Sequence, residues 1–351
     1  MMVDPAFEET ERRIKNLEKR IALEYEKAIA GVQKKLDDYL KRFYKKDATW
    51  AEWVADGKKT VAQYNEWRTN QLIMGQRWAD LRDVLAADYH HANEIARSII
   101  NGELPEIYAI NHNYGVYEVE HGLGVDTSYT LYNRHTVARI LLDDPDLFRP
   151  PGKDITPAAA TAKDLLWNRN QLQSAMLQSI LQGESIPKMA ERVARAVGEK
   201  DRRIATRNAR TMATGAQNAG RLDSYFRAQD MGIKIEKQWI ATLDSRTRHS
   251  HRELDGESVP LKEEYSNGLM YPGDPDGDPE EIWNCRCCQI ASLQGFERDL
   301  SDLSLRNTAH FEHMSYAEWK ADKKSKSNPI LLPRDKANRI RGSYIKQYRE
   351  G

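Results

Sequence analysis

A hydrophobic stripe at helical spacing runs through residues 8–46 and constrains the fold more than any other feature of this sequence. Apolar residues recur there every three or four positions, which places them on one face of a long helix. They are Ile14, Leu17, Ile21, Tyr25, Ala28, Val32, Leu36, Tyr39 and Phe43. We interpret this stripe as one arm of a helical hairpin, because a coiled coil between copies of the chain would place Glu24 in the seam.

Residues 48–57 predict the turn that ends this arm. A second apolar series at helical spacing follows over residues 61–95. Gly102 and Pro105 predict the end of that second helix, because proline inside a helix removes a hydrogen bond.

The segment after this helix has a mixed pattern. Residues 116–120 and 129–132 are β-prone and flank a glycine-rich turn, which predicts a small hairpin. Residues 136–142 predict a short helix, and the prolines and glycine of residues 145–157 predict a linker. We therefore predict a helical N-terminal region with a small hairpin over residues 1–157.

Beyond the linker, glycines punctuate a second helical part of the chain. Gly183, Gly198 and Gly232 each follow a periodic segment, and Ser185 is placed as an N-cap. The predicted helices cover residues 158–181, 185–198 and 201–231. Strand-prone segments follow at residues 233–241, at Val259 and at residues 282–293. The fold class is α+β and mainly helical, with a long N-terminal helical hairpin region, a domain of residues 158–298 that adds a small antiparallel sheet, and a charged tail of residues 299–351.

The composition of the chain does not indicate nucleic acid or a membrane as its partner. The chain has 53 basic and 53 acidic residues, so its net charge predicts neither nucleic acid nor a membrane surface. It contains no apolar run near the roughly 20 residues that a spanning helix needs, and no signal-peptide core follows Met1. We therefore expect the chain to stay in the cytoplasm where it is made and to have no membrane segment. The three clustered cysteines do not form a disulfide framework.

Two segments are locally basic. Residues 188–227 hold ten Lys or Arg and four Asp or Glu, a local net charge of +6. This pattern is typical of a solvated helix face with ordinary ion pairs, and alternatively of a surface that faces phosphates. In the tail, residues 316–319 predict a short helix and residues 320–327 a linker. The basic residues 331–348 predict a frayed C-terminus, and alternatively a segment that orders on a partner or on DNA.

The segment of residues 239–290 is the least helical part of the chain and holds all three cysteines. Cys285, Cys287 and His251 offer thiolate and imidazole, the ligand types that zinc prefers. Asp244 or His249 would supply a fourth ligand. The Cys-x-Cys spacing is not the usual Cys-x₂-Cys, although a turn at Asn284 would help both thiols to reach one ion. The alternative is that the cysteines are small buried apolar residues and that His251 is hydrogen-bonded within a loop.

The same residues allow enzymatic interpretations. Asp244 with His251 forms a candidate acid–base pair, and Cys285 with His251 a candidate nucleophile and base. Neither pair has a third group at diagnostic spacing. A metal-dependent nuclease or hydrolase acting on DNA is the alternative function, since the basic helical region would supply a DNA-facing surface. Arg246 and Arg248 are more simply explained as fork donors that fix the loop to carboxylates or backbone carbonyls.

The motifs of this segment resemble a known family. The motif W-x₄-D-x-R-T-R-x₂-H-x₂-L-D-G begins at Trp239, a Tyr-Pro-Gly-Asp turn ends at Asp274, and Asn284-Cys-Arg-Cys287 follows. This combination is similar to the tailed-phage minor head proteins, or head morphogenesis proteins, with a Mu F-like domain. Where family members often have Arg-Thr-Glu, this chain has Arg-Thr-Met212.

The resemblance implies a structural role at the portal vertex of a phage head, in capsid assembly, DNA packaging or genome ejection, without catalytic turnover. It implies the portal, capsid or scaffolding protein and double-stranded DNA as partners, and the virion head as location. We expect the polar motif residues to act as a structural clasp between loops. They are Asp244, Arg246, Arg248, His251, Asp255, Gly256 and Asn284.

Overall fold

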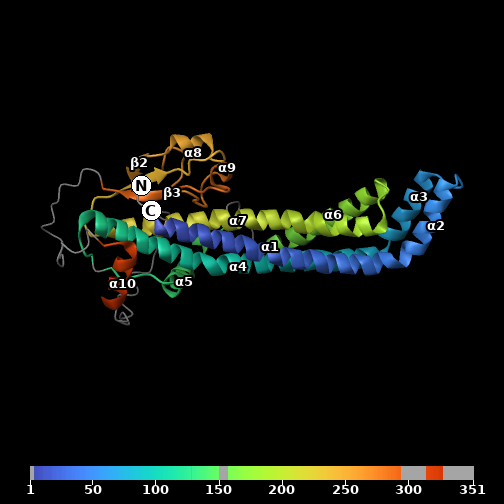
Figure 1. The fold of residues 1–351 in the computed structure, drawn as a ribbon, viewed down its shortest axis with the longest axis horizontal. Helices are drawn as coiled ribbons and strands as arrows, with labels where there is room; N and C mark the ends of the chain where they lie inside the picture. The colour runs from blue at the N-terminus through green and yellow to red at the C-terminus, as the bar shows by residue number, and fades with distance from the viewer. Residues whose placement is uncertain (1–3, 128, 150–156, 294–313, 327–351) are drawn as a thin grey trace. The chain divides into compact units, whose positions relative to one another are not determined.

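The computed structural model describes residues 4–127, 129–149, 157–293 and 314–326 and is mainly helical (Figure 1). The helices are α1 (Pro5–Leu40), α2 (Tyr44–Ala55), α3 (Val61–Arg68), α4 (Gln76–Leu123), α5 (Arg134–Asp143), α6 (Pro157–Leu181), α7 (Ile186–Asp230), α8 (His249–Glu253), α9 (Pro279–Ile282) and α10 (Tyr316–Lys326). Short helical turns are η1 (Lys41–Phe43), η2 (Thr69–Ile73) and η3 (Pro145–Phe148), and the strands are β1 (Glu236–Ile240), β2 (Ser258–Pro260) and β3 (Cys288–Ser292). The predicted α+β, mainly helical class is confirmed.

The chain divides into two compact units, each assembled from segments that are distant in sequence. The helical unit comprises residues 18–99 and 153–206, and the mixed unit comprises residues 1–17, 100–152 and 207–351. This division differs from the contiguous regions suggested by the sequence, because α1, α4 and α7 each contribute residues to both units. No helix among the described residues is long and apolar enough to cross a membrane.

Parts of α1, α4, α6 and α7 pack around one core in the helical unit. The predicted stripe of α1 supplies its inner face, since Val32 and Leu36 are fully buried. Leu85 and Tyr89 of α4, and Met176 of α6, complete the same core. The stripe therefore does what its spacing predicts, which is to bury one face of the helix against its neighbours.

The predicted turn at residues 48–57 is wrong in most of its length, because α2 occupies Tyr44–Ala55. The chain turns only at Asp56–Thr60, where Gly57 has a φ of 68°. The aromatic side chain of Trp50 on α2 stacks on Trp67 of α3, with ring centroids 5.6 Å apart. This cluster keeps α2 helical although its sequence lacks a regular apolar stripe.

The predicted helix end at Gly102 and Pro105 is also wrong, since α4 runs through both residues to Leu123. Proline leaves carbonyls of the preceding turn without their usual helical donors. The missing N–H of Pro105 affects the Asn101 carbonyl, and the Arg134 guanidinium donates to the adjacent Gly102 carbonyl at 3.3 Å. Burial of Leu104 and Ile107 on either side of the proline favours continuation of the helix.

The predicted hairpin does not form. Residues 116–120 belong to α4, where Val116, Val119 and Leu123 are buried at helical spacing. The other predicted strand has no strand partner among the described residues. Instead, the Tyr132 N–H donates to Asn113 Oδ1 at 2.8 Å and the Tyr132 carbonyl accepts from Asn113 Nδ2 at 2.9 Å. One side-chain amide thus replaces the backbone partner that a strand would need.

The predicted helix end at Gly198 is wrong as well, because α7 continues from Ile186 to Asp230. A Cβ at Gly198 would lie 2.4 Å from the side chain of Ile29 and 3.1 Å from the ring of Tyr89. This glycine therefore permits close packing rather than a helix stop. The predicted ends at Gly183 and Gly232 are confirmed, and both have positive φ.

The mixed unit contains a three-stranded antiparallel sheet with the order β2-β1-β3. Gln238 of β1 pairs with Ser258 of β2 and with Ile290 of β3. These strands confirm the small antiparallel sheet predicted after residue 232. The sheet lies beside α7, because Arg221 donates to the Gln289 carbonyl at 3.0 Å.

Helix α10 packs in the mixed unit through a buried polar cluster. Glu120 accepts from Trp319 Nε1 at 2.7 Å and from Lys323 Nζ at 2.8 Å. The predicted helix at residues 316–319 is confirmed, but it extends to Lys326, so the predicted linker of residues 320–327 is wrong up to that point. The basic segment of residues 331–348 lies outside the described residues.

Candidate functional site

Three predicted ligand side chains converge in the mixed unit. His251 Nδ1 lies 3.5 Å from Cys287 Sγ and 3.7 Å from Cys285 Sγ. All three residues are buried, with at most 2% of each exposed. Their ligand atoms all lie within 4.8 Å of one another, which is close enough to hold one metal ion. Among the described residues, this is the group of three or more His, Cys, Asp or Glu side chains that meets this condition. We call His251, Cys285 and Cys287 the triad.

Local backbone geometry explains how closely spaced cysteines face one histidine. His251 lies on α8, and both cysteines follow α9. Asn284 has a φ of 56°, which makes it the non-glycine residue with positive φ among the described residues. Its left-handed conformation turns the chain directly before Cys285. The predicted turn at Asn284 is therefore confirmed.

A carboxylate fixes the orientation of the histidine. Glu281 Oε2 lies 3.0 Å from His251 Nε2, and it also accepts from Ser250 at 3.2 Å and Asn267 at 3.3 Å. In the tautomer whose Nε2–H donates a hydrogen bond to Glu281, Nδ1 presents its lone pair to the two sulfur atoms. The ring of His251 also packs edge-on against buried Trp239, with centroids 5.2 Å apart.

The two thiols have opposite electrostatic environments. The hydrogen bond from Cys285, followed by the one with His251, lowers the pKa of Cys287 to about 5. The proximity of Cys287 and burial together raise the pKa of Cys285. The surroundings thus favour the charged form of the Cys287 thiol and the neutral form of the Cys285 thiol.

Asp244 does not join the triad. Its carboxylate accepts from both terminal nitrogens of Arg286, at 2.5 and 2.7 Å, and from the Arg246 N–H at 2.9 Å. These hydrogen bonds lower the pKa of Asp244. The prediction of Asp244 as a metal ligand, and as an acid–base partner of His251, is thus contradicted, because Arg286 occupies both carboxylate oxygens. His249 is also absent from the triad: its exposed ring lies 3.3 Å from Glu253.

The other predicted clasp residues act mainly through the backbone. Arg248 donates to the Trp283 carbonyl, which agrees with the predicted tie to a carbonyl. Asp255 accepts from the Ala241 N–H at 2.8 Å, and Gly256 with a φ of 85° donates to the Trp239 carbonyl at 2.9 Å. The Arg246 side chain is 72% exposed and lies 3.7 Å from Asp244. It contributes to the loop through its N–H rather than through its guanidinium.

Helix α7 carries a polar stripe that sequence reasoning missed. Thr211 accepts from the Asn284 N–H at 3.0 Å, and Thr214 donates to the Cys285 carbonyl at 2.8 Å. Asn218 donates to the Pro272 carbonyl at 3.0 Å and the Cys287 carbonyl at 3.2 Å, and accepts from the Gln289 N–H at 2.9 Å. The spacing of three and four residues was a visible signal for one helix face. The sequence does not indicate which residues this helix face contacts, because its partners lie about seventy residues further on.

The positive charge of residues 188–227 is largely engaged within the protein. Arg192 pairs with Glu184 at 2.6 Å, and Arg202 with Glu199 at 2.7 Å. Arg221 is fully buried and pairs with Asp4, and the Arg207 guanidinium lies 3.8 Å from the ring centroid of Trp283. These contacts favour ion pairs and packing over a phosphate-facing surface.

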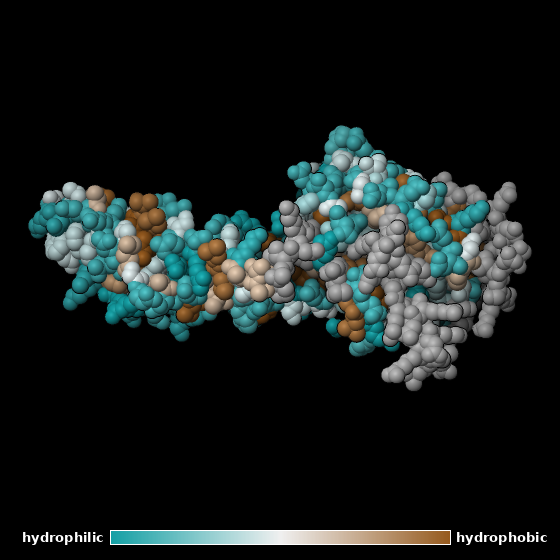
Figure 2. Space-filling view, turned by 180° about the vertical axis from the view of Figure 1, so that it is seen from behind, coloured by the Kyte–Doolittle hydropathy of each residue, from teal (hydrophilic) through white to brown (hydrophobic). Residues whose placement is uncertain are grey.

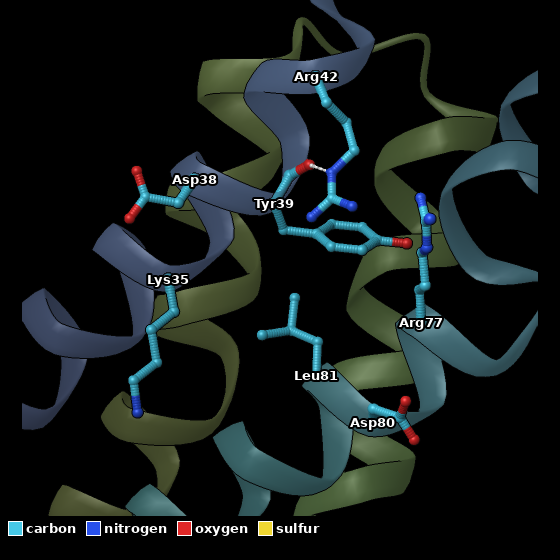
Figure 3. Close-up of a pocket in the computed structure, with 7 residues that line it drawn as sticks. All are labelled: Lys35, Asp38, Tyr39, Arg42, Arg77, Asp80 and Leu81. Atoms are coloured by element: carbon cyan, nitrogen blue, oxygen red, sulfur yellow. Dashed lines mark hydrogen bonds between the residues drawn. The ribbon is translucent and has the colours of Figure 1, made fainter.

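A surface pocket of about 570 Å³ lies in the helical unit between α1 and α4. Figure 3 shows its lining, with the guanidinium groups of Arg42 and Arg77 near the ring of Tyr39. Arg42 lies over that ring, 4.7 Å from its centroid, and donates to the Tyr39 carbonyl at 2.8 Å. Asp38 and Asp80 extend away from the ring (Figure 3). The lining therefore carries both signs of charge without a nucleophile–base pair.

Comparison with known proteins places the triad in a family context. The family described as phage Mu protein F like protein matches residues 170–290. The minor head protein GP7 of Bacillus phage SPP1 is 30% identical over 161 residues, which cover 44% of this chain and 52% of that protein. The NAD(+)–arginine ADP-ribosyltransferase EFV of Enterococcus faecalis is 33% identical over 168 residues, which cover 46% of this chain and 34% of that protein.

An uncharacterized protein of Haemophilus influenzae is 28% identical over 156 residues, which cover 44% of this chain and 31% of that protein. The chain thus spans between about a third and about half of the length of these relatives. No solved structure matches the chain significantly. The matched residues 170–290 include the polar stripe of α7, the triad, β1, β2 and the first part of β3. Residues 170–290 of this chain are therefore similar to the phage Mu protein F like family, and the chain shares part of its length with a phage minor head protein.

Proposed function

We propose that this protein is a minor structural component of a tailed-phage head that acts at the portal vertex, in assembly, DNA packaging or genome ejection. The observation that carries the proposal is the family match over residues 170–290, supported by similarity to a minor head protein. Its location is the virion head, after synthesis in the host cytoplasm. Its partners are the portal protein and the capsid or scaffolding protein, with double-stranded DNA as a further contact.

The polar residues of the matched region support a structural role. Asp244, Arg248 and Asp255 each bind a backbone group or another fixed side chain within the same loops. Glu281 contacts the histidine nitrogen that points away from the thiols, so it does not stand where a general base would meet a reactant at the triad. The three residues of the triad are buried, with at most 2% of each exposed, which favours a role in holding the loops together over nucleophilic catalysis.

The helical unit supports a role in contacts with other proteins. Leu166, Leu177 and Leu181 of α6 are 58%, 39% and 66% exposed. Leu166 and Leu177 are about three helical turns apart, and Leu177 and Leu181 are about one turn apart. The three side chains therefore form one outward stripe. Figure 2 shows hydrophobic side chains interrupting the hydrophilic surface of the helical unit. Such exposed apolar stripes on helices are typical of surfaces that bind a partner.

The direct experiment is to detect the protein in purified phage heads by mass spectrometry, and to count particles made with and without its gene. The proposal predicts that the protein is present in heads and that its loss reduces the yield of filled or infectious particles. Binding of the purified protein to the portal protein of the same genome, followed by light scattering, tests the finer role. Absence from heads together with normal particle yield would overturn the proposal.

The same purified protein distinguishes the alternative functions. A metal-dependent nuclease would cleave double-stranded DNA on addition of a divalent cation, and His251→Ala would abolish the cleavage. The relative named as an ADP-ribosyltransferase shares only 34% of its length with this chain, and transfer from labelled NAD to arginine is assayed in parallel. A structural head protein shows neither reaction.

A further inference from the structure

We propose that the triad binds one zinc ion through His251 Nδ1, Cys285 Sγ and Cys287 Sγ, and that this ion connects α8 to the segment before β3. Zinc–sulfur bonds of about 2.3 Å and zinc–nitrogen bonds of about 2.0–2.1 Å place tetrahedral ligand atoms about 3.5–3.8 Å apart. The two nitrogen–sulfur distances are 3.5 and 3.7 Å. Both histidine–cysteine distances therefore match the edge length of a zinc tetrahedron, and all three ligand atoms lie within 4.8 Å of one another.

The hydrogen bonding of the histidine fits a ligand better than an ordinary buried side chain. In the tautomer whose Nε2–H donates a hydrogen bond to Glu281, Nδ1 has one lone pair directed at two sulfur atoms. One lone pair can accept from only one thiol, whereas a cation accepts electrons from all three groups. A carboxylate on the outer nitrogen is the usual partner of a zinc-bound histidine, because it fixes the tautomer and the ring orientation.

The surroundings explain why a metal would be useful here. The core around the triad is small, and it consists of Trp239, Ala241, Leu254, Tyr265, Leu269, Ile282, Cys285 and Cys287. Most of the chain between His251 and Cys285 is turn and loop, with β2 as its short strand and α9 as its short helix. A bound ion would join residues 251 and 285–287 across this loop-rich segment, as structural zinc does in small domains. Asp244 is engaged by Arg286, so among the described residues the fourth position is left to a ligand from solvent.

The chain offers a matched control for the cysteines. Cys288 is buried and adjacent to Cys287 in sequence, yet it belongs to β3 and stands outside the triad. Cys288→Ser thus removes one thiol of the same chain without removing a proposed ligand. His249→Gln does the same for a nearby exposed imidazole.

The experiment measures zinc content by elemental analysis, and thermal unfolding before and after chelation, on the full chain. The wild type, Cys288→Ser and His249→Gln should each hold one equivalent of zinc, and their melting temperatures should fall on chelation and recover with added zinc. Cys285→Ser and Cys287→Ser should lose the bound ion. Glu281→Gln should keep one equivalent at saturation but bind it about 10–100-fold more weakly, as expected for loss of the histidine's outer partner.

Cobalt(II) provides a readout that does not depend on folding yield of the variants. Added to the metal-free wild type, it should give the charge-transfer and visible bands of a tetrahedral thiolate site. The proposal fails if the wild type is metal-free as purified and neither zinc nor cobalt changes its melting temperature or its spectrum. It also fails if Cys287→Ser folds and retains a full equivalent of zinc with unchanged affinity. These outcomes are independent of whether the protein is found in phage heads.

Discussion

The carboxylate of Asp244 and the guanidinium of Arg286 form a two-pronged ion pair across 42 residues, with both oxygen–nitrogen distances at or below 2.7 Å. Asp244 also accepts from the Arg246 N–H, so it links the loop after β1 to the residue between the two cysteines of the triad. Fork-to-fork pairs of this kind add geometric specificity as well as attraction.

Asp244→Asn should therefore lower the melting temperature at neutral pH. Because the folded-state pKa of Asp244 is depressed, its contribution is present above the unfolded pKa of about 3.9 and is lost as pH falls through the folded value. The difference between wild type and variant should accordingly shrink in strong acid. Thermal unfolding at neutral and acid pH measures it. Arg246→Ala is the matched control and should be nearly neutral, since that side chain is 72% exposed; equal losses in both variants would contradict the assigned roles.

Asn218 on α7 should be far more sensitive than an exposed asparagine. It is fully buried and bonds the Pro272 and Cys287 carbonyls and the Gln289 N–H. Asn218→Ala leaves these groups unsatisfied, and we expect it to cost about 2–4 kcal/mol, since each orphaned buried polar group costs roughly 1–3 kcal/mol. Denaturant unfolding measures the loss. Asn170→Ala on the exposed face of α6 should change stability by less than about 0.5 kcal/mol, and a similarly small effect at Asn218 would argue against the contact set.

The helices and the candidate site differ in how far the sequence predicts them. The spacing of residues such as Val32 and Leu36 is enough to predict a buried helix face, because the pattern depends only on neighbouring positions in the sequence. The three residues of the triad are also predictable from the sequence, since thiolate and imidazole are recognisable metal-ligand types. Glu281 and Arg286 were not identified, because a carboxylate or guanidinium has no distinctive spacing and its partner depends on the folded loops.

The errors share one physical cause, which is tertiary contact that overrides local preference. Pro105 and Gly198 look like helix ends, yet packing on both sides carries α4 and α7 through them. Val116 and Val119 favour strands by propensity, but their burial at helical spacing prevails. Tyr132 finds its backbone partner in the Asn113 side chain, which no pattern in the sequence indicates.

Glycines of α7 in the mixed unit should resist substitution. A Cβ at Gly220 would lie 2.5 Å from the Tyr108 carbonyl oxygen and 3.1 Å from the His112 nitrogen, both of which are backbone atoms of α4. Gly220→Ala should therefore destabilise the protein by about 1–3 kcal/mol or more through overpacking. Gly31→Ala is the control, because its Cβ would meet nothing within 4 Å and helical alanine is favoured by roughly 0.5–1 kcal/mol. Chemical denaturation of both variants tests the prediction, and a stabilised Gly220→Ala would refute the close approach of α4 and α7 at this point.

Asp201 should make the helical unit less stable as pH rises. Burial raises the pKa of Asp201 to about 7, against which the hydrogen bond with Asn93 acts only in part. The folded state then keeps a proton that the unfolded state releases above pH of about 4, so stability falls between about pH 4 and pH 7, by at most about 1.4 kcal/mol per pH unit.

Asp201→Asn should remove this slope and raise the melting temperature at pH 7 and above. Unfolding curves of the wild type and the variant across pH 4–8 check the prediction. Asp56→Asn, which changes an exposed carboxyl of the same unit, should leave the slope as it is. A wild-type curve that rises in stability from pH 4 to pH 7, with no difference in Asp201→Asn, would exclude a buried neutral Asp201.

The outward stripe of α6 provides a test of the proposed assembly role that is separate from folding. In the double variant Leu166→Gln and Leu181→Gln, both changed side chains are more than half exposed, so the free energy of unfolding should change by less than about 0.5 kcal/mol. If the stripe binds a head or portal component, the same variant should be depleted from purified heads and should bind the portal protein more weakly. Leu142→Gln is the control, because Leu142 is 82% exposed but lies on α5 of the mixed unit. Normal incorporation of the double variant would show that α6 is not the contact surface, whereas depletion of both variants alike would point to a general effect of surface leucines.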